Sequence, residues 1–72
     1  MANEMKLSLR AARVNAKMTQ IQAAERLGVT AQTLRNWETG RNCPSLENAQ
    51  RLCDLYQVEI NSIFIPKKAN EN

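Results

Sequence analysis

The sequence predicts a small all-α protein of five helices, and three observations lead to that prediction. The chain has 72 residues, which is enough for one domain with a small core. Its two prolines, Pro44 and Pro66, leave most of the chain without the residue that interrupts helices most strongly. Ser and Thr residues repeatedly precede apolar residues spaced three or four apart, which is typical of N-capped amphipathic helices.

The first two predicted helices are delimited by capping residues. Ser8 caps a helix that runs to about Ala16. Thr19 caps the second helix, and Gln22 three residues later completes a capping box, in which the hydroxyl and the amide each satisfy one backbone N–H. Gly28 ends this helix, because glycine adopts the left-handed C-terminal conformation at no steric cost.

The third helix follows almost at once. Thr30 is its N-cap and Gly40 closes it. The connection from Gly28 to Thr30 is very short and contains glycine. Two helices joined in this way form a helix-turn-helix signature.

The remaining elements lie after Pro44. Ser45 caps a fourth helix, whose apolar stripe ends at Tyr56. Asn61 is expected to cap a last short helical turn that carries Ile63 and Phe64.

The predicted helices form one compact domain over residues 8–65. A short N-terminal arm, 1–7, precedes this domain, and a flexible polar tail, 66–72, follows it.

Composition restricts the possible functions. Ten Lys and Arg residues against seven Asp and Glu give a net charge of +3, which favours an acidic partner such as nucleic acid. Two cysteines and no histidine are too few ligands for a structural zinc site, and we expect Cys53 in the core and Cys43 in a loop. There is no nucleophile–base pair or phosphate-cradling glycine loop, so neither an enzyme, a cofactor nor a small-molecule substrate is expected.

The predicted location follows from two missing signals. No apolar run reaches the ~20 residues that span a bilayer. The N-terminal sequence lacks the apolar core of a signal peptide. A cytoplasmic protein without a membrane partner is therefore expected.

The third helix carries the candidate binding surface. At about 100° per residue, Leu34 and Trp37 point to the core, and four polar residues point roughly opposite: Gln32, Arg35, Asn36 and Thr39. A carboxamide matches the donor–acceptor pair of adenine in the major groove, and arginine can bind guanine or a phosphate. Ala31 and the Thr33 methyl are small enough to lie against a thymine methyl. The alternative is that these side chains are merely solvated.

Candidate phosphate-binding residues flank this surface. Thr19 and Gln20 open the second helix, where backbone N–H groups and the positive end of the dipole favour an anion. Lys17 precedes them, and Arg41 and Asn42 follow the third helix. Phosphate contacts around base contacts are the division of labour of a protein–DNA interface.

The segment TQIQAAERLGVTAQTLRNWETGRNCPSLENAQRLCDLYQVEINSIF resembles the lambda-repressor-like (Cro/cI, XRE) helix-turn-helix family from end to end. With SLRAARVNAKM before it, the resemblance covers about residues 8 to 64. Its elements are TQ at the start of the second helix, the LGV turn, a Thr cap, an apolar-x-x-apolar-Glu run, a Gly, and PSL at the fourth helix. The order and spacing of these elements make the resemblance specific.

The resemblance implies five helices with the third as recognition helix, and a role for each matching position. Gln20 would grip a phosphate and brace the recognition helix. Arg13 and Glu38 match an ion pair that ties the first helix to the end of the third, for which a structural role is favoured. The full set of expected base contacts is Ala31, Gln32, Thr33, Arg35 and Asn36. The full set of expected phosphate contacts is Lys17, Thr19, Gln20, Thr30, Thr39, Arg41 and Asn42.

Some positions depart from the family pattern. Ala23 stands where Leu is usual, and Trp37 is larger than the usual aliphatic residue and can fill the space that Ala23 leaves. Ala31 stands where a polar base-reading residue is common. These departures leave the fold prediction unchanged and make the target sequence unpredictable.

Homodimerisation on DNA is a further expectation, because proteins of this group usually bind two half-sites as symmetric dimers. The candidate contacts are Ile60, Phe64 and Ile65, in a very apolar segment. These residues can instead serve only to close the core, and both interpretations stay open.

The leading functional hypothesis is a bacterial or phage-encoded transcriptional repressor that binds a pseudo-palindromic operator in double-stranded DNA through the third helix. The alternative is a protein-interaction module of the same fold, an antitoxin or adaptor, with contacts at exposed apolar residues such as Ile21 and Ile65.

Overall fold

Four α-helices, one 3₁₀ turn and a two-stranded sheet make up residues 6–65, the part of the chain that the computed structural model describes. The predicted tail and residues 1–5 of the predicted arm lie outside this range. The elements are β1 (Leu7–Ser8), α1 (Leu9–Asn15), α2 (Gln20–Leu27), α3 (Ala31–Thr39), α4 (Leu46–Tyr56), η1 (Ile60–Ser62) and β2 (Ile63–Phe64).

Each α-helix begins at the capping residue that the sequence predicts. The side-chain oxygens of Ser8, Thr19, Thr30 and Ser45 accept hydrogen bonds from the backbone N–H of Ala11, Gln22, Thr33 and Asn48, respectively. The capping box at the start of α2 is complete, and α2 and α3 end at glycines with positive φ. Each cap involves residues only three positions apart, which is why the helix starts could be predicted from the sequence.

The prediction of a fifth helix is wrong. The last turn is a single 3₁₀ turn over Ile60–Ser62 with Glu59, not Asn61, at its N-cap. Ile63 and Phe64 form β2, which runs parallel to β1 with Leu7 opposite Ile63. A segment this short forms too few helical hydrogen bonds to offset the conformational entropy that helix nucleation costs. Pairing with β1 satisfies its backbone groups instead.

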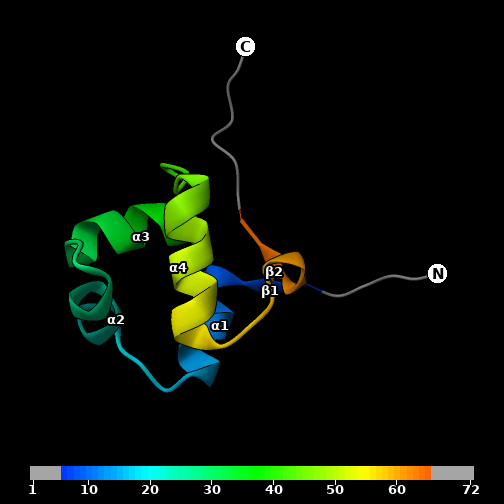
Figure 1. The fold of residues 1–72 in the computed structure, drawn as a ribbon. Helices are drawn as coiled ribbons and strands as arrows, with labels where there is room; N and C mark the ends of the chain where they lie inside the picture. Colours follow the sequence, from blue (N-terminus) through cyan, green and yellow to red (C-terminus); the bar gives the residue numbers. More distant parts are fainter. Residues whose placement is uncertain (1–5, 66–72) are drawn as a thin grey trace, which may run out of the picture.

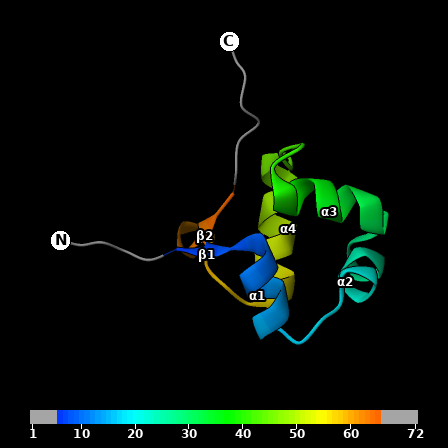
Figure 2. The same cartoon turned by 180° about the vertical axis from the view of Figure 1, so that it is seen from behind.

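The core lies where the four helices meet. Figures 1 and 2 show α2 and α3 on one side of α4, and α1 with the small sheet on the other. Cys53 is buried and Cys43 exposed, as predicted. Buried apolar side chains from every α-helix and from β2 form one cluster: Leu9, Ala12, Ala23, Ala24, Leu27, Leu34, Trp37, Leu52, Cys53, Tyr56 and Ile63.

Candidate nucleic-acid interface

A tight turn fixes α3 against α2. Gly28 adopts φ 76°, a left-handed conformation that reverses the chain directly after α2. The N–H of Gly28 then donates to the carbonyl of Glu25 at 3.2 Å, and that of Val29 to the carbonyl of Ala24 at 3.0 Å. These bonds satisfy carbonyls that the helix end leaves unpaired. The turn therefore holds the start of α3 in a fixed position beside α2.

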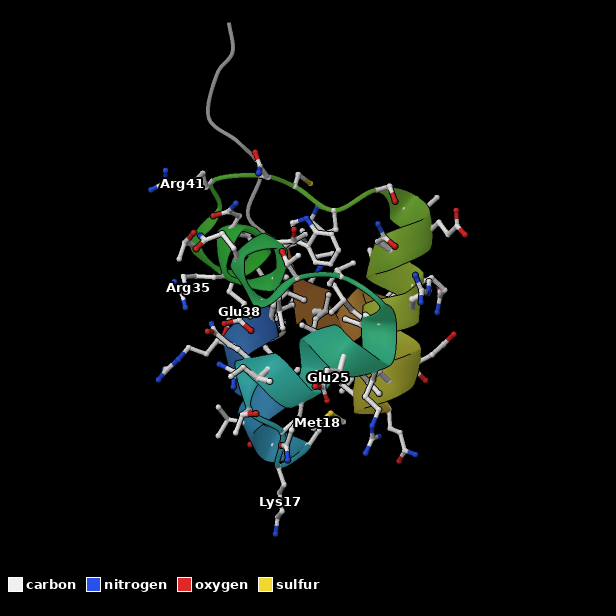
Figure 3. All side chains as sticks on the ribbon, turned by 90° about the vertical axis from the view of Figure 1, so that its left-hand side faces the viewer. Lys17, Met18, Glu25, Arg35, Glu38 and Arg41 are labelled. Carbon is white, nitrogen blue, oxygen red and sulfur yellow. The ribbon has the colours of Figure 1, made fainter. Side chains whose placement is uncertain are left out.

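Helix α3 has one buried and one exposed face. Leu34 is 0% exposed and Trp37 is 6% exposed, so both anchor the helix in the core. Gln32 and Arg35 are exposed on the other face, and Asn36 is half-buried. Figure 3 shows Arg35 and Arg41 projecting from the same side of the molecule. The burial pattern agrees with the face that the sequence predicts.

The three long polar side chains of this face are hydrogen-bonded to one another. Arg35 donates from Nη1 to Oε1 of Gln32 at 3.3 Å. Gln32 in turn donates from Nε2 to Oδ1 of Asn36 at 3.0 Å. We call these residues the polar chain of α3. Sequence reasoning placed each residue on the face but did not foresee the bonds, which depend on rotamers.

Three threonines, the N-cap Thr30 and Thr33 and Thr39 within α3, make local bonds. Thr33 accepts from the hydroxyl of Thr30 at 2.9 Å, while the same Thr30 oxygen caps the helix. The Thr39 hydroxyl donates to the carbonyl of Arg35 at 3.0 Å. The hydrogens of Thr30 and Thr39 are thus already engaged, so a phosphate contact from either hydroxyl would require its reorientation. Ala31 is half-buried at the start of the helix.

At the start of α2, the capping box uses part of the predicted phosphate-binding group. The N–H of Thr19 donates to the Gln22 side chain at 2.9 Å, and the Thr19 oxygen accepts from the Gln22 N–H at 3.1 Å. The Thr19 hydroxyl hydrogen remains available for an anion. The first-turn N–H groups of Gln20 and Ile21 have no intrahelical acceptor, as at any helix start.

The basic residues predicted to flank the exposed face of α3 lie in two separate places, one after α3 and one before α2. Arg41 and Asn42 are exposed directly after α3, and the N–H of Asn42 donates to the carbonyl of Asn36 at 3.2 Å. Lys17 is exposed before α2, in a left-handed conformation with φ 63°. In Figure 3 its side chain projects from the opposite end of the molecule to Arg41.

A buried ion pair joins α1 to the end of α3. Arg13 Nε donates to Glu38 Oε2 at 2.7 Å, and the two side chains are only 9% and 4% exposed. Arg13 also donates to the backbone carbonyl of Met18 at 3.0 Å. The hydrogen bond to Glu38 raises the pKa of Arg13, although burial opposes the rise. This is the pair that the family resemblance implies, and Figure 3 shows Glu38 inward of Arg35.

Gln20 belongs to the same network. Its Nε2 donates to Glu38 Oε1 at 3.0 Å, so the side chain at the start of α2 is tied to the end of α3. One amide hydrogen and the carbonyl oxygen of Gln20 remain for other contacts. Glu38 therefore ties α3 both to α1 and to the side chain expected to grip a phosphate.

Tyr56 lies beside this network and was not singled out from the sequence. Its hydroxyl is buried and has no hydrogen-bond partner among the described residues. Burial, helped by the negative charge of Glu38, raises the pKa of Tyr56 to about 12. An apolar stripe in the sequence identifies Tyr56 as core but gives no sign of the neighbouring charges.

An open hollow of about 480 Å³ separates the start of α2 from α3. Its lining includes two predicted phosphate contacts, Thr19 and Gln20, and two predicted base contacts, Ala31 and Arg35, and is completed by Arg13, Met18 and Ile21. Residues of both groups therefore border the same open hollow.

Two features are absent from residues 6–65. This part of the chain contains no group of three or more His, Cys, Asp or Glu side chains arranged to hold a metal ion. It also contains no helix with the length and apolar character needed to cross a bilayer.

Comparison with known proteins identifies the family. Neither the curated proteins nor the solved structures gave a match to this sequence. A family model described as helix-turn-helix matches residues 9–63, which is most of the chain and includes all four α-helices. The chain belongs to the Cro/cI-type (XRE) helix-turn-helix family of DNA-binding transcription regulators.

Proposed function

We propose that this protein is a sequence-specific repressor that places α3 in the major groove of a pseudo-palindromic operator. The observation that carries the proposal is the exposed face of α3, where Arg35 and two carboxamides gather without an exposed acid. The single acid of α3 is Glu38, whose side chain is 4% exposed and paired with Arg13. The surface therefore offers hydrogen-bond donors and acceptors without repelling a polyanion.

Base reading is assigned to the residues of the exposed face of α3. Gln32 and Asn36 suit adenine, and Arg35 suits guanine or a phosphate. Ala31 and the Thr33 methyl are suited to thymine methyl groups. Phosphates on either side would be bound around the start of α2, at the two ends of α3 and in the segment after α3, through Lys17, Thr19, Gln20, Thr30, Thr39, Arg41 and Asn42. Such a protein would act on DNA in a bacterial cytoplasm and would block transcription by occupying the operator.

A symmetric dimer is part of the proposal. Phe64 is 56% exposed, and Ile60 and Ile65 are half-buried beside it in the chain and pack on the core. Two copies joined through this surface would present two α3 helices to half-sites one helical turn, about 34–36 Å, apart.

The test is selection of random duplex DNA on the purified protein at two salt concentrations. A single enriched pseudo-palindrome is expected, with affinity falling steeply as salt rises, because bound phosphates release counterions. Gln32→Ala should lower affinity for that site by about 1–3 kcal/mol and relax preference at one base pair. Gln50→Ala, the same change at an exposed glutamine of α4, is the matched control and should leave binding unchanged. Weak binding without sequence preference would refute the repressor.

A protein-interaction module is the second candidate. It is favoured by Ile21 and Leu46, which are 64% and 80% exposed. Leu46 borders an open, mainly apolar groove of about 770 Å³ between α4 and η1. A variant in which Gln32 and Asn36 are both replaced by Ala separates the two candidate functions. It should abolish the activity of a repressor and leave that of a protein-interaction module unchanged.

A further inference from the structure

The hydrogen bonds of the polar chain of α3 run in one direction. Arg35 donates to the oxygen of Gln32, and the nitrogen of Gln32 donates to the oxygen of Asn36. All three residues lie within two turns of one helix, at spacings of three and four where side chains meet. The chain ends at the amide nitrogen of Asn36.

Of the three side chains, only Arg35 fixes the direction of these hydrogen bonds. A carboxamide can rotate by 180° and exchange its oxygen and its nitrogen, so Gln32 and Asn36 alone could pair in either sense. Arg35 cannot reverse, because a guanidinium has five N–H donors and no acceptor. If Gln32 turned its nitrogen toward Arg35, two donors would face each other. The cation therefore holds the oxygen of Gln32 on its own side.

Each member keeps some free hydrogen-bonding capacity. Gln32 retains one lone pair on its oxygen and one hydrogen on its nitrogen, which are the two groups that adenine requires. Asn36 retains both hydrogens of its nitrogen, which suit the acceptors of guanine, adenine or thymine. The orientation of the chain thus decides which edge of each carboxamide faces a base.

We infer that Arg35 is a positioning residue for base reading, which orients the carboxamide of Gln32, and through it that of Asn36, before DNA binds. This inference rests on the proposed function and adds to it that Arg35, Gln32 and Asn36 read their bases as one coupled unit. The base preference at the pair read by Gln32 depends on Arg35 even if Arg35 does not touch that pair.

Selections of random duplexes on single variants test the inference. Gln32→Ala identifies the base pair that Gln32 reads, as the pair at which preference is lost. Arg35→Met should then reduce preference at that same pair by roughly fivefold or more, the lower end of what one good side chain–base contact contributes. Arg35→Lys, which keeps a cation with donors only, should retain that preference even if overall affinity falls.

The matched control is Arg41→Met, which removes the same charge from an exposed position just after α3. It should weaken binding to all sequences alike and leave the preference at the Gln32 pair intact. In the Arg35→Met background, Gln32→Ala should cause little further loss of preference. Melting curves of each variant verify folding, which is expected because Gln32 and Arg35 are exposed.

The outcomes are distinct. The inference is overturned if Arg35→Met behaves like Arg41→Met, with weaker binding but unchanged preference at the Gln32 pair. It is also overturned if Gln32→Ala alters no preference while the unchanged protein still selects one site. If the unchanged protein selects no sequence at all, the proposed function itself fails, and the coupled reading fails with it.

Discussion

The side chain of Glu38 connects three of the helices. Its carboxylate accepts from Arg13 and from Gln20, so it joins α1, the start of α2 and the end of α3. A buried ion pair does not by itself stabilise a fold more than apolar residues would, but loss of one partner leaves a buried charge unpaired. Glu38 is therefore a buried acid of α3 whose carboxylate is already paired within the fold.

Glu38→Ala should destabilise the fold by up to about 3–5 kcal/mol, because Arg13 would remain buried without a counter-charge. Urea denaturation at neutral pH measures the change. Glu25→Ala, which removes an exposed carboxylate from α2, is the control and should alter stability little. An unchanged midpoint in the Glu38 variant would contradict the structural role of the pair.

Tyr56 should make stability fall at alkaline pH. Its pKa is raised from 10 in the unfolded chain to about 12 in the fold, so the folded state holds the proton more tightly. The resulting stability is complete below pH 10 and is lost as pH rises toward 12, by about 2–3 kcal/mol in total.

Tyr56→Phe is the control for this titration, measured by urea denaturation at several pH values. In this variant the free energy of unfolding should fall less between pH 10 and pH 12 than it does in the unchanged protein. At neutral pH it should be at least as stable as the unchanged protein, because the removed hydroxyl has no partner among the described residues. Identical pH profiles for the two proteins would show that the Tyr56 proton is not linked to folding.

At the scale of the elements, most of the α-helices are ended by a residue in the left-handed conformation. Three of the four α-helices end in a left-handed residue: Gly28, Gly40 and Gln57. Gln57, with φ 59°, is the one that bears a side chain. The end of α4 therefore carries backbone strain that glycine would relieve.

Gln57→Gly should stabilise the protein by up to about 1 kcal/mol, since the relief of about 1–2 kcal/mol exceeds the entropy cost of glycine. Thermal denaturation followed by circular dichroism checks this. Gln50→Gly is the matched control inside α4 and should destabilise by about 1 kcal/mol. A lower melting temperature for Gln57→Gly would mean that its side chain stabilises the fold more than its conformation strains it.

At the scale of the whole molecule, the proposed DNA-binding and dimer surfaces belong to different parts of the fold. The face of α3 lies on one side of α4, and the β1–β2 sheet lies on the other (Figures 1 and 2). A twofold contact at the sheet would therefore leave α3 uncovered. This separation makes DNA binding and dimerisation independently testable.

Phe64→Ser should weaken binding to a full operator while leaving binding to an isolated half-site unchanged, because it removes apolar area only from the proposed dimer contact. Titration of both duplexes, with sedimentation of the free protein, measures the two effects. Val14→Ser is the control, since Val14 is 52% exposed and Phe64 is 56% exposed. Equal losses on both duplexes would count against the dimer.

The sequence alone predicted the elements that obey local rules. Caps at Ser8, Thr19, Thr30 and Ser45 and the short turn at Gly28 gave the starts of the four α-helices, and periodicity assigned the exposed face of α3. Each of these signals involves residues within about four positions of one another, where backbone and side chain interact whatever the remaining chain does.

Apart from the Arg13–Glu38 pair that the family resemblance implied, only the tertiary structure decided the contacts between distant residues. Leu7 pairs with Ile63 across almost the whole chain, which converts the expected fifth helix into one 3₁₀ turn and a strand. The bond from Gln20 to Glu38 likewise exists only because α2 and α3 pack together. Such contacts leave no periodic signal in the sequence, since they depend on how the helices pack rather than on the order of neighbouring residues.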